Sequence, residues 1–328
     1  MSGHRTIYWT VSLLVIFAGC VSGGNSEIQY PEPEKPHYYY DVLAYGDYLY
    51  AVSPWGLDIF RTGAGSLRRI GGVETPGEAQ TLALSGGVLY VSDTLGRLHI
   101  LDVSIPSRPS KIAELELNHT AQRIVISGKR AYLACVSSGL VILDVSTLRP
   151  VGLYKPGKYS YPKSVDVQDE LLYLTDFAMR LYVARVTNDS VEFLYFVPTT
   201  SVPHDVVIAG DHAYVASSDG GVDVYRMAGS RLVHHQNIPL PGFALRLATY
   251  GDYLLVTLAN RGVAILKILE DGGLELVAEY DTPGNAYGIA VSDGRAYVAD
   301  YNGGIAVLDL RQLPGRVPVK VFPPEVNG

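Results

Sequence analysis

The chain has 328 residues, of which 48% are hydrophobic, 10% aromatic and 18% charged, so it is long enough for two ordinary domains or one large β or repeat architecture. Its formal net charge is −7 and it contains no run of basic residues, which excludes the polycationic surface that nucleic-acid binding requires. We therefore expect a globular protein whose partners do not include nucleic acid.

Residues 1–19 have the pattern of a signal peptide. The apolar run IYWTVSLLVIFA, residues 7–18, is shorter than the roughly 20 residues that a membrane-spanning helix needs. The next motif, FAGC at residues 17–20, resembles the lipobox of bacterial and archaeal lipoproteins, although Phe17 stands where leucine is usual. The resemblance implies that Cys20 is lipidated and becomes the first mature residue. The alternative is a soluble secreted protein cut at the end of the same segment.

Residues 20–36 are predicted to be a flexible tether. The sequence VSGGNSEIQYPEPEKP that follows Cys20 is polar and rich in glycine and proline, so it reaches at most about 50 Å when extended. Two acyl chains, at about 0.8 kcal/mol per buried methylene, hold a protein on a membrane stably. The prediction is an extracytoplasmic location, anchored through lipid to the cell membrane, or to the outer membrane where the host has one.

One pattern then repeats seven times between residues 37 and 323. Each copy has a turn, an LYV-like segment, a short loop and an apolar run that ends in a charged residue, and the copies are spaced by 40 to 42 residues. Residues 324–328 remain as a C-terminal tail. The central residues of the seven LYV-like segments are Tyr50, Tyr90, Tyr132, Tyr173, Tyr214, Leu255 and Tyr297.

Each copy contains four short strand candidates separated by tight-turn sequences, and no segment of the repeats has a helical period. An array of such units predicts an all-β fold, a seven-bladed β-propeller of four-stranded blades. The continuous apolar run LVIL at residues 140–143 fits a strand covered on both faces by neighbouring blades. Where the run ends in aspartate, as at Asp144, we expect the carboxylate to accept backbone N–H groups of the proline-containing turn that follows.

The segments GLVILDVS at 139, GRLHILDVSIPSRP at 96 and GGIAVLDLRQLP at 303 resemble the LVIVD repeat family, β-propellers of bacterial and archaeal cell-surface proteins. The resemblance extends over nearly the whole mature chain and is weakest in the fourth copy. It implies the propeller fold and a location at the cell surface, and it supplies no catalytic residues.

A ring of polar residues is predicted at one mouth of the central channel. The positions nine and ten residues before each central residue fall where the innermost strand of a blade begins, and a channel mouth is a common small-ligand site. Basic side chains gather on one side of this ring, so the predicted ligand is a small anion or another small molecule; the alternative is that the residues only solvate the rim. The candidates are Asp41, Gln80, Gln122, Arg123, Lys163, His204, Asp205 and Arg246.

Four aromatic residues are candidates for contact with a partner protein or a sugar surface, namely Tyr40, Trp55, Tyr287 and Tyr301. They belong to the first and last repeats, which meet where the ring closes. The alternative is that they pack against the chain that enters the first blade.

The sequence contains no convincing catalytic constellation, and we predict no metal site and no cofactor. The only acid–base pair at the expected mouth is His204 with Asp205, whose side chains should diverge because they are adjacent on a strand. We therefore predict a non-catalytic cell-surface lipoprotein that serves as a binding or assembly platform for an envelope protein or a surface glycan. The alternative is ligand binding, or an unrecognised enzyme activity, at the channel mouth.

Overall fold

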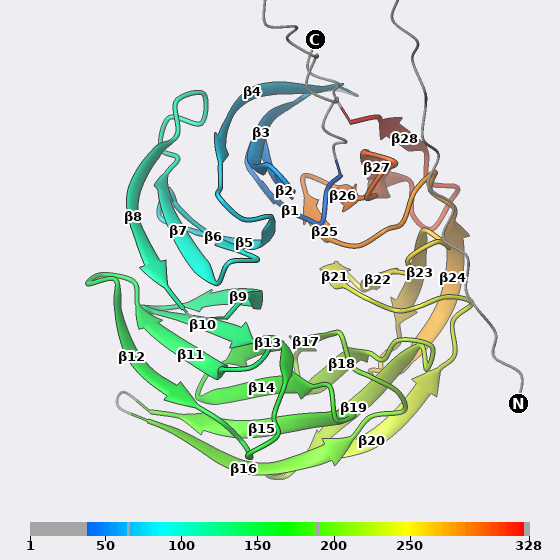
Figure 1. Cartoon of the computed structure of the whole chain (residues 1–328). Helices are drawn as coiled ribbons and strands as arrows, with labels where there is room; N and C mark the ends of the chain where they lie inside the picture. Colours follow the sequence, from blue (N-terminus) through cyan, green and yellow to red (C-terminus); the bar gives the residue numbers. More distant parts are fainter. Residues whose placement is uncertain (1–37, 64–65, 118, 188–189, 325–328) are drawn as a thin grey trace, which may run out of the picture. The chain divides into compact units, whose positions relative to one another are not determined.

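The computed structural model describes residues 38–63, 66–117, 119–187 and 190–324. In these residues the strands form seven four-stranded antiparallel sheets, which are arranged as blades around a ring (Figure 1). This confirms the predicted seven-bladed β-propeller. The predicted signal peptide, Cys20 with its tether, and residues 325–328 of the tail lie outside the described residues.

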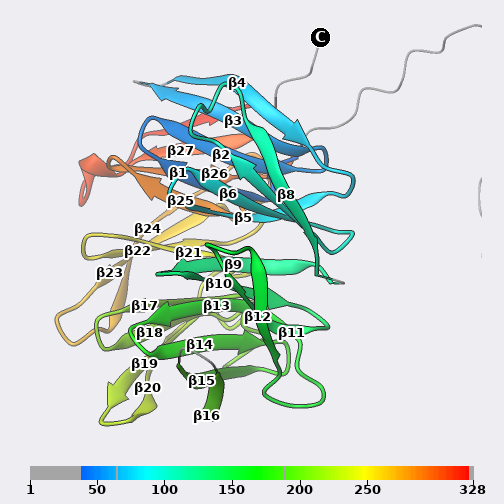
Figure 2. The same cartoon turned by 90° about the vertical axis from the view of Figure 1, so that its left-hand side faces the viewer.

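Each blade consists of four strands that are consecutive in the sequence. The first three blades contain β1 (Asp41–Tyr45), β2 (Tyr48–Ser53), β3 (Gly56–Gly63), β4 (Ser66–Glu74); β5 (Ala79–Ser85), β6 (Val88–Asp93), β7 (Arg97–Asp102), β8 (Ser110–Glu116); and β9 (Ala121–Ser127), β10 (Arg130–Cys135), β11 (Gly139–Asp144), β12 (Arg149–Tyr154). Figure 2 shows from the side how the sheets of the second, third and fourth blades follow one another.

The remaining four blades have the same order of strands, and a single 3₁₀ turn, η1 (Leu310–Gln312), precedes the last strand. They contain β13 (Pro162–Gln168), β14 (Leu171–Asp176), β15 (Arg180–Val186), β16 (Val191–Pro198); β17 (Asp205–Ala209), β18 (His212–Ala216), β19 (Val222–Ala228), β20 (Arg231–Ile238); β21 (Leu247–Tyr250), β22 (Tyr253–Thr257), β23 (Val263–Ile268), β24 (Leu274–Tyr280); and β25 (Ile289–Ser292), β26 (Arg295–Ala299), β27 (Ile305–Asp309), β28 (Val319–Phe322).

The hydrophobic core lies between the blades. Between the third and fourth blades, for example, Leu140 and Ile142 of β11 pack with Leu172 and Leu174 of β14 in one cluster. Leu133 of β10 belongs to the cluster on the other side of the third blade. The second and third strands are therefore covered on both faces, which explains their continuous apolar sequences, whereas the outer strand β12 is mostly exposed.

A glycine precedes or begins the third strand in six blades and has a positive φ angle in each. At Gly221, for which φ is +77°, an added Cβ atom would lie 2.0 Å from the carbonyl oxygen of Ile238 on the outer strand. Only glycine avoids both the strained backbone and this contact. The six residues are Gly56, Gly96, Gly139, Gly221, Gly262 and Gly304.

The predicted role of the strand-terminal aspartates is confirmed. The carboxylate of Asp144 accepts the backbone N–H groups of Ser146, at 3.0 Å, and Thr147, at 2.9 Å. The backbone N–H of Thr147 is the main cause that lowers the pKa of Asp144. Asp102 accepts the N–H of Ser104 in the same way, so these carboxylates fix the turn to the outer strand.

Within residues 38–324 the ring closes without a strand shared between the first and last blades. The first and last blades are joined by a cluster that contains Tyr39, Phe60, Tyr297 and Ile305, and by a single β-bridge between Tyr39 and Tyr301. Closure therefore depends on side-chain packing between β1–β3 and β25–β27, not on a mixed sheet.

Candidate functional site

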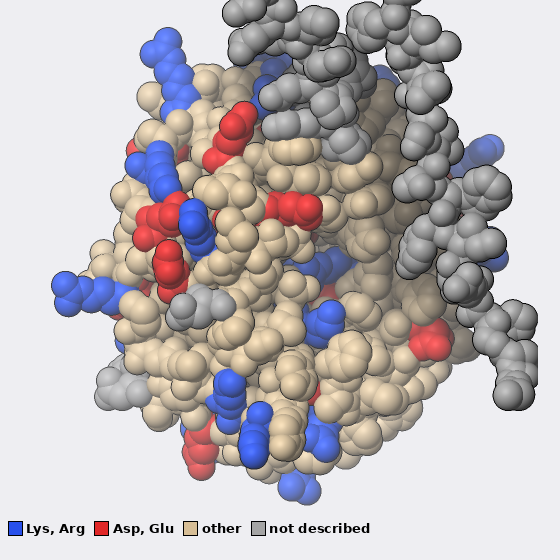
Figure 3. Space-filling model, in the orientation of Figure 1, with Lys and Arg blue, Asp and Glu red and all other residues tan. Residues whose placement is uncertain are grey.

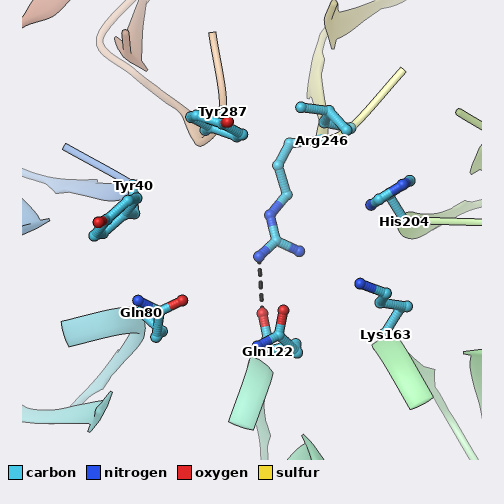
Figure 4. A pocket seen from close by; sticks show the side chains of 8 residues that line it. Tyr40, Gln80, Gln122, Lys163, His204, Arg246 and Tyr287 are labelled. Carbon is cyan, nitrogen blue, oxygen red and sulfur yellow. Dashed lines mark hydrogen bonds between the residues drawn. The ribbon is translucent and has the colours of Figure 1, made fainter. Parts of the chain in front are cut away.

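A polar pocket of about 330 Å³ occupies the channel mouth (Figure 4). Every blade contributes to its wall through a residue at or just before the start of its innermost strand. The lining residues are Tyr40, Gln80, Gln122, Lys163, His204, Leu245, Arg246 and Tyr287. Five of the eight predicted mouth residues, Gln80, Gln122, Lys163, His204 and Arg246, are thus brought together, and their role in ligand binding stays a prediction.

Arg246 crosses the channel. Its terminal nitrogen Nη2 donates a 2.8 Å hydrogen bond to the backbone carbonyl of Gln122, three blades away along the ring (Figure 4). Its Nη1 atom lies 3.7 Å from the carboxylate of Asp205. The guanidinium therefore has two fixed partners and sits between the pocket and the deeper channel.

The other three predicted mouth residues, Asp41, Arg123 and Asp205, do not line this pocket, because they lie one residue further along their strands. Asp205 accepts hydrogen bonds from Ser164 Oγ at 2.5 Å and from the backbone N–H of Leu247 at 3.0 Å. Its carboxylate is also 3.8 Å from Nε of Arg123. These contacts link the third, fourth, fifth and sixth blades.

Asp41 has a similar linking role between other blades. Its buried carboxylate accepts a 2.8 Å hydrogen bond from Thr81 Oγ1 of the second blade. Burial opposes the charge of Arg123, but the carboxylates of Asp205 and Asp41 contribute to raising its pKa above the ordinary value. The carboxylates of the deeper layer therefore keep Arg123 in its charged form.

The pocket layer itself is basic, because none of its lining residues is acidic. Among the described residues Lys163 has no carboxylate at ion-pair distance, and its Nζ lies 5.8 Å from the ring centroid of Phe177. Burial, together with the charge of Arg246, lowers the pKa of Lys163. Burial, followed by the charges of Lys163 and Arg246, lowers the pKa of His204 to about 4. At neutral pH His204 is therefore uncharged, and a bound anion would relieve the repulsion within this layer.

The pKa of His204 predicts a loss of stability in acid. Between the ordinary value of 6.5 and about 4 the unfolded chain binds a proton at His204 that the folded chain does not bind. The part of the folding stability that depends on a neutral His204 is therefore fully present above pH 6.5. It is lost as the pH falls toward 4, and the free energy of unfolding drops by an amount on the order of 2 to 3 kcal/mol. Denaturant unfolding of the wild type and of His204→Gln at pH 7 and pH 4.5 should show a smaller acid loss in the variant. Equal losses would contradict the assignment.

Three of the four predicted aromatic residues meet at the ring closure. The Tyr301 ring lies 5.7 Å from that of Tyr40 and 5.5 Å from that of Tyr287, and it stacks on Tyr38 at 4.4 Å. Trp55 is half-buried in the turn between β2 and β3. These contacts agree with the packing alternative, and a role in partner binding stays a prediction for these residues.

A surface that the sequence reasoning missed lies beside the pocket, on the same face of the fourth blade. We call it the blade-4 rim. Its aromatic and apolar side chains are exposed, up to 71% for Tyr159, and they come from the β12–β13 and β14–β15 connections and the end of β16. The rim consists of Tyr159, Tyr161, Phe177, Met179 and Phe196.

Basic side chains accompany these rings. The guanidinium carbon of Arg180 lies 4.7 Å from the centroid of Phe196, and Nζ of Lys158 lies 5.4 Å from that of Tyr159. Residues 149–163 contain four Lys or Arg and no Asp or Glu, in a chain with net charge −7. Figure 3 shows mostly blue side chains over this lower part of the ring. The locally basic composition of residues 149–163 is the feature of the sequence from which the rim could have been predicted.

The described residues contain no group of three His, Cys, Asp or Glu side chains that could hold a metal ion. Burial raises the pKa of Cys135 to about 12, so its thiol stays protonated and packs in the core. No helix in the described part of the chain has the length and apolar character needed to cross a bilayer.

Four segments of the chain match the LVIVD repeat: residues 76–114, 119–149, 203–224 and 283–310. They coincide with parts of the second, third, fifth and seventh blades. The resemblance inferred from the sequence is therefore confirmed. No curated protein gives a significant match to the chain.

Solved structures share the fold at low identity. PorZ, described as an essential bacterial surface component of the type-IX secretion system of Porphyromonas gingivalis, is 19% identical with a TM-score of 0.66, over 90% of this chain and 39% of PorZ. BamB from Moraxella catarrhalis is 19% identical with a TM-score of 0.57, over 82% of this chain and 80% of BamB. The computationally designed protein Ika8 is 10% identical with a TM-score of 0.60, over 84% of this chain and 96% of its own. These similarities show the fold alone.

Proposed function

Because the chain is a seven-bladed β-propeller that carries LVIVD repeats, we propose that it is a non-catalytic binding or assembly platform at the cell surface. Its partner is an envelope protein or a surface glycan, and Cys20 anchors it through lipid to the outside of a membrane. The FAGC motif at residues 17–20 supports the anchor. The description of PorZ as a bacterial surface component supports the location.

The blade-4 rim is the observation that carries the binding role. Tyr159, Phe177 and Phe196 are each at least half exposed on one face of one blade. Monomeric proteins rarely leave clustered aromatic side chains in water unless the patch serves an interaction. Tyrosine, phenylalanine, methionine and arginine are also enriched at the centres of interfaces, where tyrosine and arginine are among the residues that contribute most to binding.

A photo-cross-linking amino acid at position 177 tests this role in the lipid-anchored, full-length chain in native membranes. We expect a discrete cross-linked product, because Phe177 lies on the rim. The matched control is position 45, an exposed tyrosine at the end of β1, at the opposite end of the blades. The proposal fails if no product forms at 177, or if both positions give the same products.

Ligand binding at the channel mouth is the second candidate. It is favoured by the pocket, whose basic side chains Lys163 and Arg246 face no acidic lining residue. An enzyme activity there would need an acid–base pair. The contacts of the described residues include no hydrogen bond between the side chains of His204 and Asp205, and Asp205 lies in the deeper layer.

A further inference from the structure

We propose that the mouth pocket binds a carboxylate-bearing sugar, the hexuronic-acid type of residue found in acidic glycans. The inference rests on the proposed function and narrows it, because it assigns to the pocket one of the two partner classes, the glycan. It is carried by three different kinds of side chain that face one another across the pocket (Figure 4).

The first side of the pocket carries two cations, Lys163 and Arg246, beside the uncharged His204. Lys163, His204 and Arg246 come from the starts of three successive blades, and none of the residues beside them in the lining is acidic. Arg246 is already held by Gln122 and Asp205, so the amine of Lys163 is the cation left to pair with a ligand. A carboxylate bound here would form a charge-assisted hydrogen bond in a partly water-excluded site.

The second side carries amides. Gln80 lies across the pocket from His204 and Lys163, and Gln122 lies between Gln80 and Lys163 (Figure 4). The described contacts include no hydrogen bond to either side-chain amide, although the backbone carbonyl of Gln122 receives Arg246. An amide offers both a donor and an acceptor, which is what a sugar hydroxyl needs.

The third side is aromatic. Tyr287 and Tyr40 line the pocket where the first and last blades meet, and both rings are braced by Tyr301. The hydroxyl of Tyr40 donates a 3.0 Å hydrogen bond to Glu78, which fixes its ring. A tyrosine face provides apolar area for the C–H face of a sugar ring, and its hydroxyl edge remains polar.

The combination selects the ligand class. A simple anion would use only the cationic side and leave the amides and rings without a function. A neutral sugar would leave Lys163 without a counter-charge. The pocket volume of about 330 Å³ leaves room for one or two sugar residues, at the lower end of the range for ligand pockets.

Titration calorimetry on the full-length chain tests the inference with three probes: D-glucuronate, D-glucose, which lacks the carboxylate, and acetate, which lacks the ring. We expect glucuronate to bind at least tenfold more tightly than either of the other two. Lys163→Met should remove the preference over glucose, and Lys163→Arg should retain it. The matched control is Lys129→Met, an exposed lysine in the β9–β10 turn at the other end of the blades.

Equal binding of acetate and glucuronate would overturn the inference in favour of a simple anion site. Tighter binding of N-acetyl-aspartate than of glucuronate would overturn it in favour of an acidic peptide. Absence of any binding by a folded chain would also overturn it, with folding checked by cooperative thermal unfolding. The photo-cross-link at position 177 tests the proposed function independently of the pocket. A cross-linked product at 177 in a chain that does not bind glucuronate would therefore leave the proposed function in place.

Discussion

Replacing Asp93 with alanine is expected to lower the free energy of unfolding by about 3 to 5 kcal/mol. Asp93 is completely buried at the end of β6, and its carboxylate accepts the backbone N–H groups of Gly77, Leu95 and Arg97. The same carboxylate is 3.0 Å from Nε2 of His99, which is also buried. Removing it leaves two buried donors, the N–H of Gly77 and the ring of His99, and two part-buried ones without an acceptor, and such losses cost far more than an average hydrogen bond.

Urea unfolding at pH 7 measures this effect. Asp47→Ala is the matched control, because Asp47 lies in the exposed β1–β2 turn, and we expect it to change stability by no more than about 0.5 kcal/mol. The loss of stability in Asp93→Asn should lie between those of Asp93→Ala and Asp47→Ala, since the amide oxygen can still accept some of these hydrogen bonds. An Asp93→Ala variant as stable as Asp47→Ala would refute this account of the turn.

Replacing Tyr39 with alanine is also expected to lower the free energy of unfolding by about 3 to 5 kcal/mol, because it opens a cavity at the ring closure. Tyr39 is only 2% exposed, its ring packs edge-on against Phe60, and its hydroxyl donates a hydrogen bond to the buried Asp58. Its backbone also forms the single bridge to Tyr301 of the last blade. Since the described strands include none shared across the closure, this one bridge is the extent of the backbone pairing that supports the packing there.

Thermal and urea unfolding check the prediction together. Tyr39→Phe keeps the ring and loses the hydroxyl contact, so its cost should be about 1 kcal/mol. Tyr45→Ala, at a tyrosine that is 68% exposed, should be nearly neutral. If Tyr39→Ala were no worse than Tyr45→Ala, the closure would have to depend on other contacts.

The blade architecture could be predicted from the sequence because its signals are local. The spacing of 40 to 42 residues, the tight turns and the continuous apolar runs all lie within one repeat. The same register also placed Gln80, Lys163 and His204 correctly around one mouth, since equivalent positions of equivalent blades must face the same channel. Even the turn-fixing role of Asp144 was visible, because its partners are two and three residues away.

Other features depend on residues that are distant in the sequence. Position counting could not separate the pocket layer from the deeper layer, in which Asp41 reaches Thr81 and Asp205 reaches Leu247. The buried aspartates Asp93, Asp176 and Asp300 were also missed, because their acceptor role involves the connection from the preceding blade. Nothing in one repeat indicates that such a partner will be present.

The sequence by itself therefore determined the repeat, the four strands of each blade, the number of blades and the surfaces that had to be buried. Only the tertiary structure decided how the ring closes around Tyr39, how Arg246 reaches across to Gln122, and that the blade-4 rim lies beside Lys163. The physical reason is the range of the forces involved. Strand formation and turn chemistry depend on neighbours within a few residues, whereas the pocket is made by side chains from seven separate blades that meet only when the circle is complete.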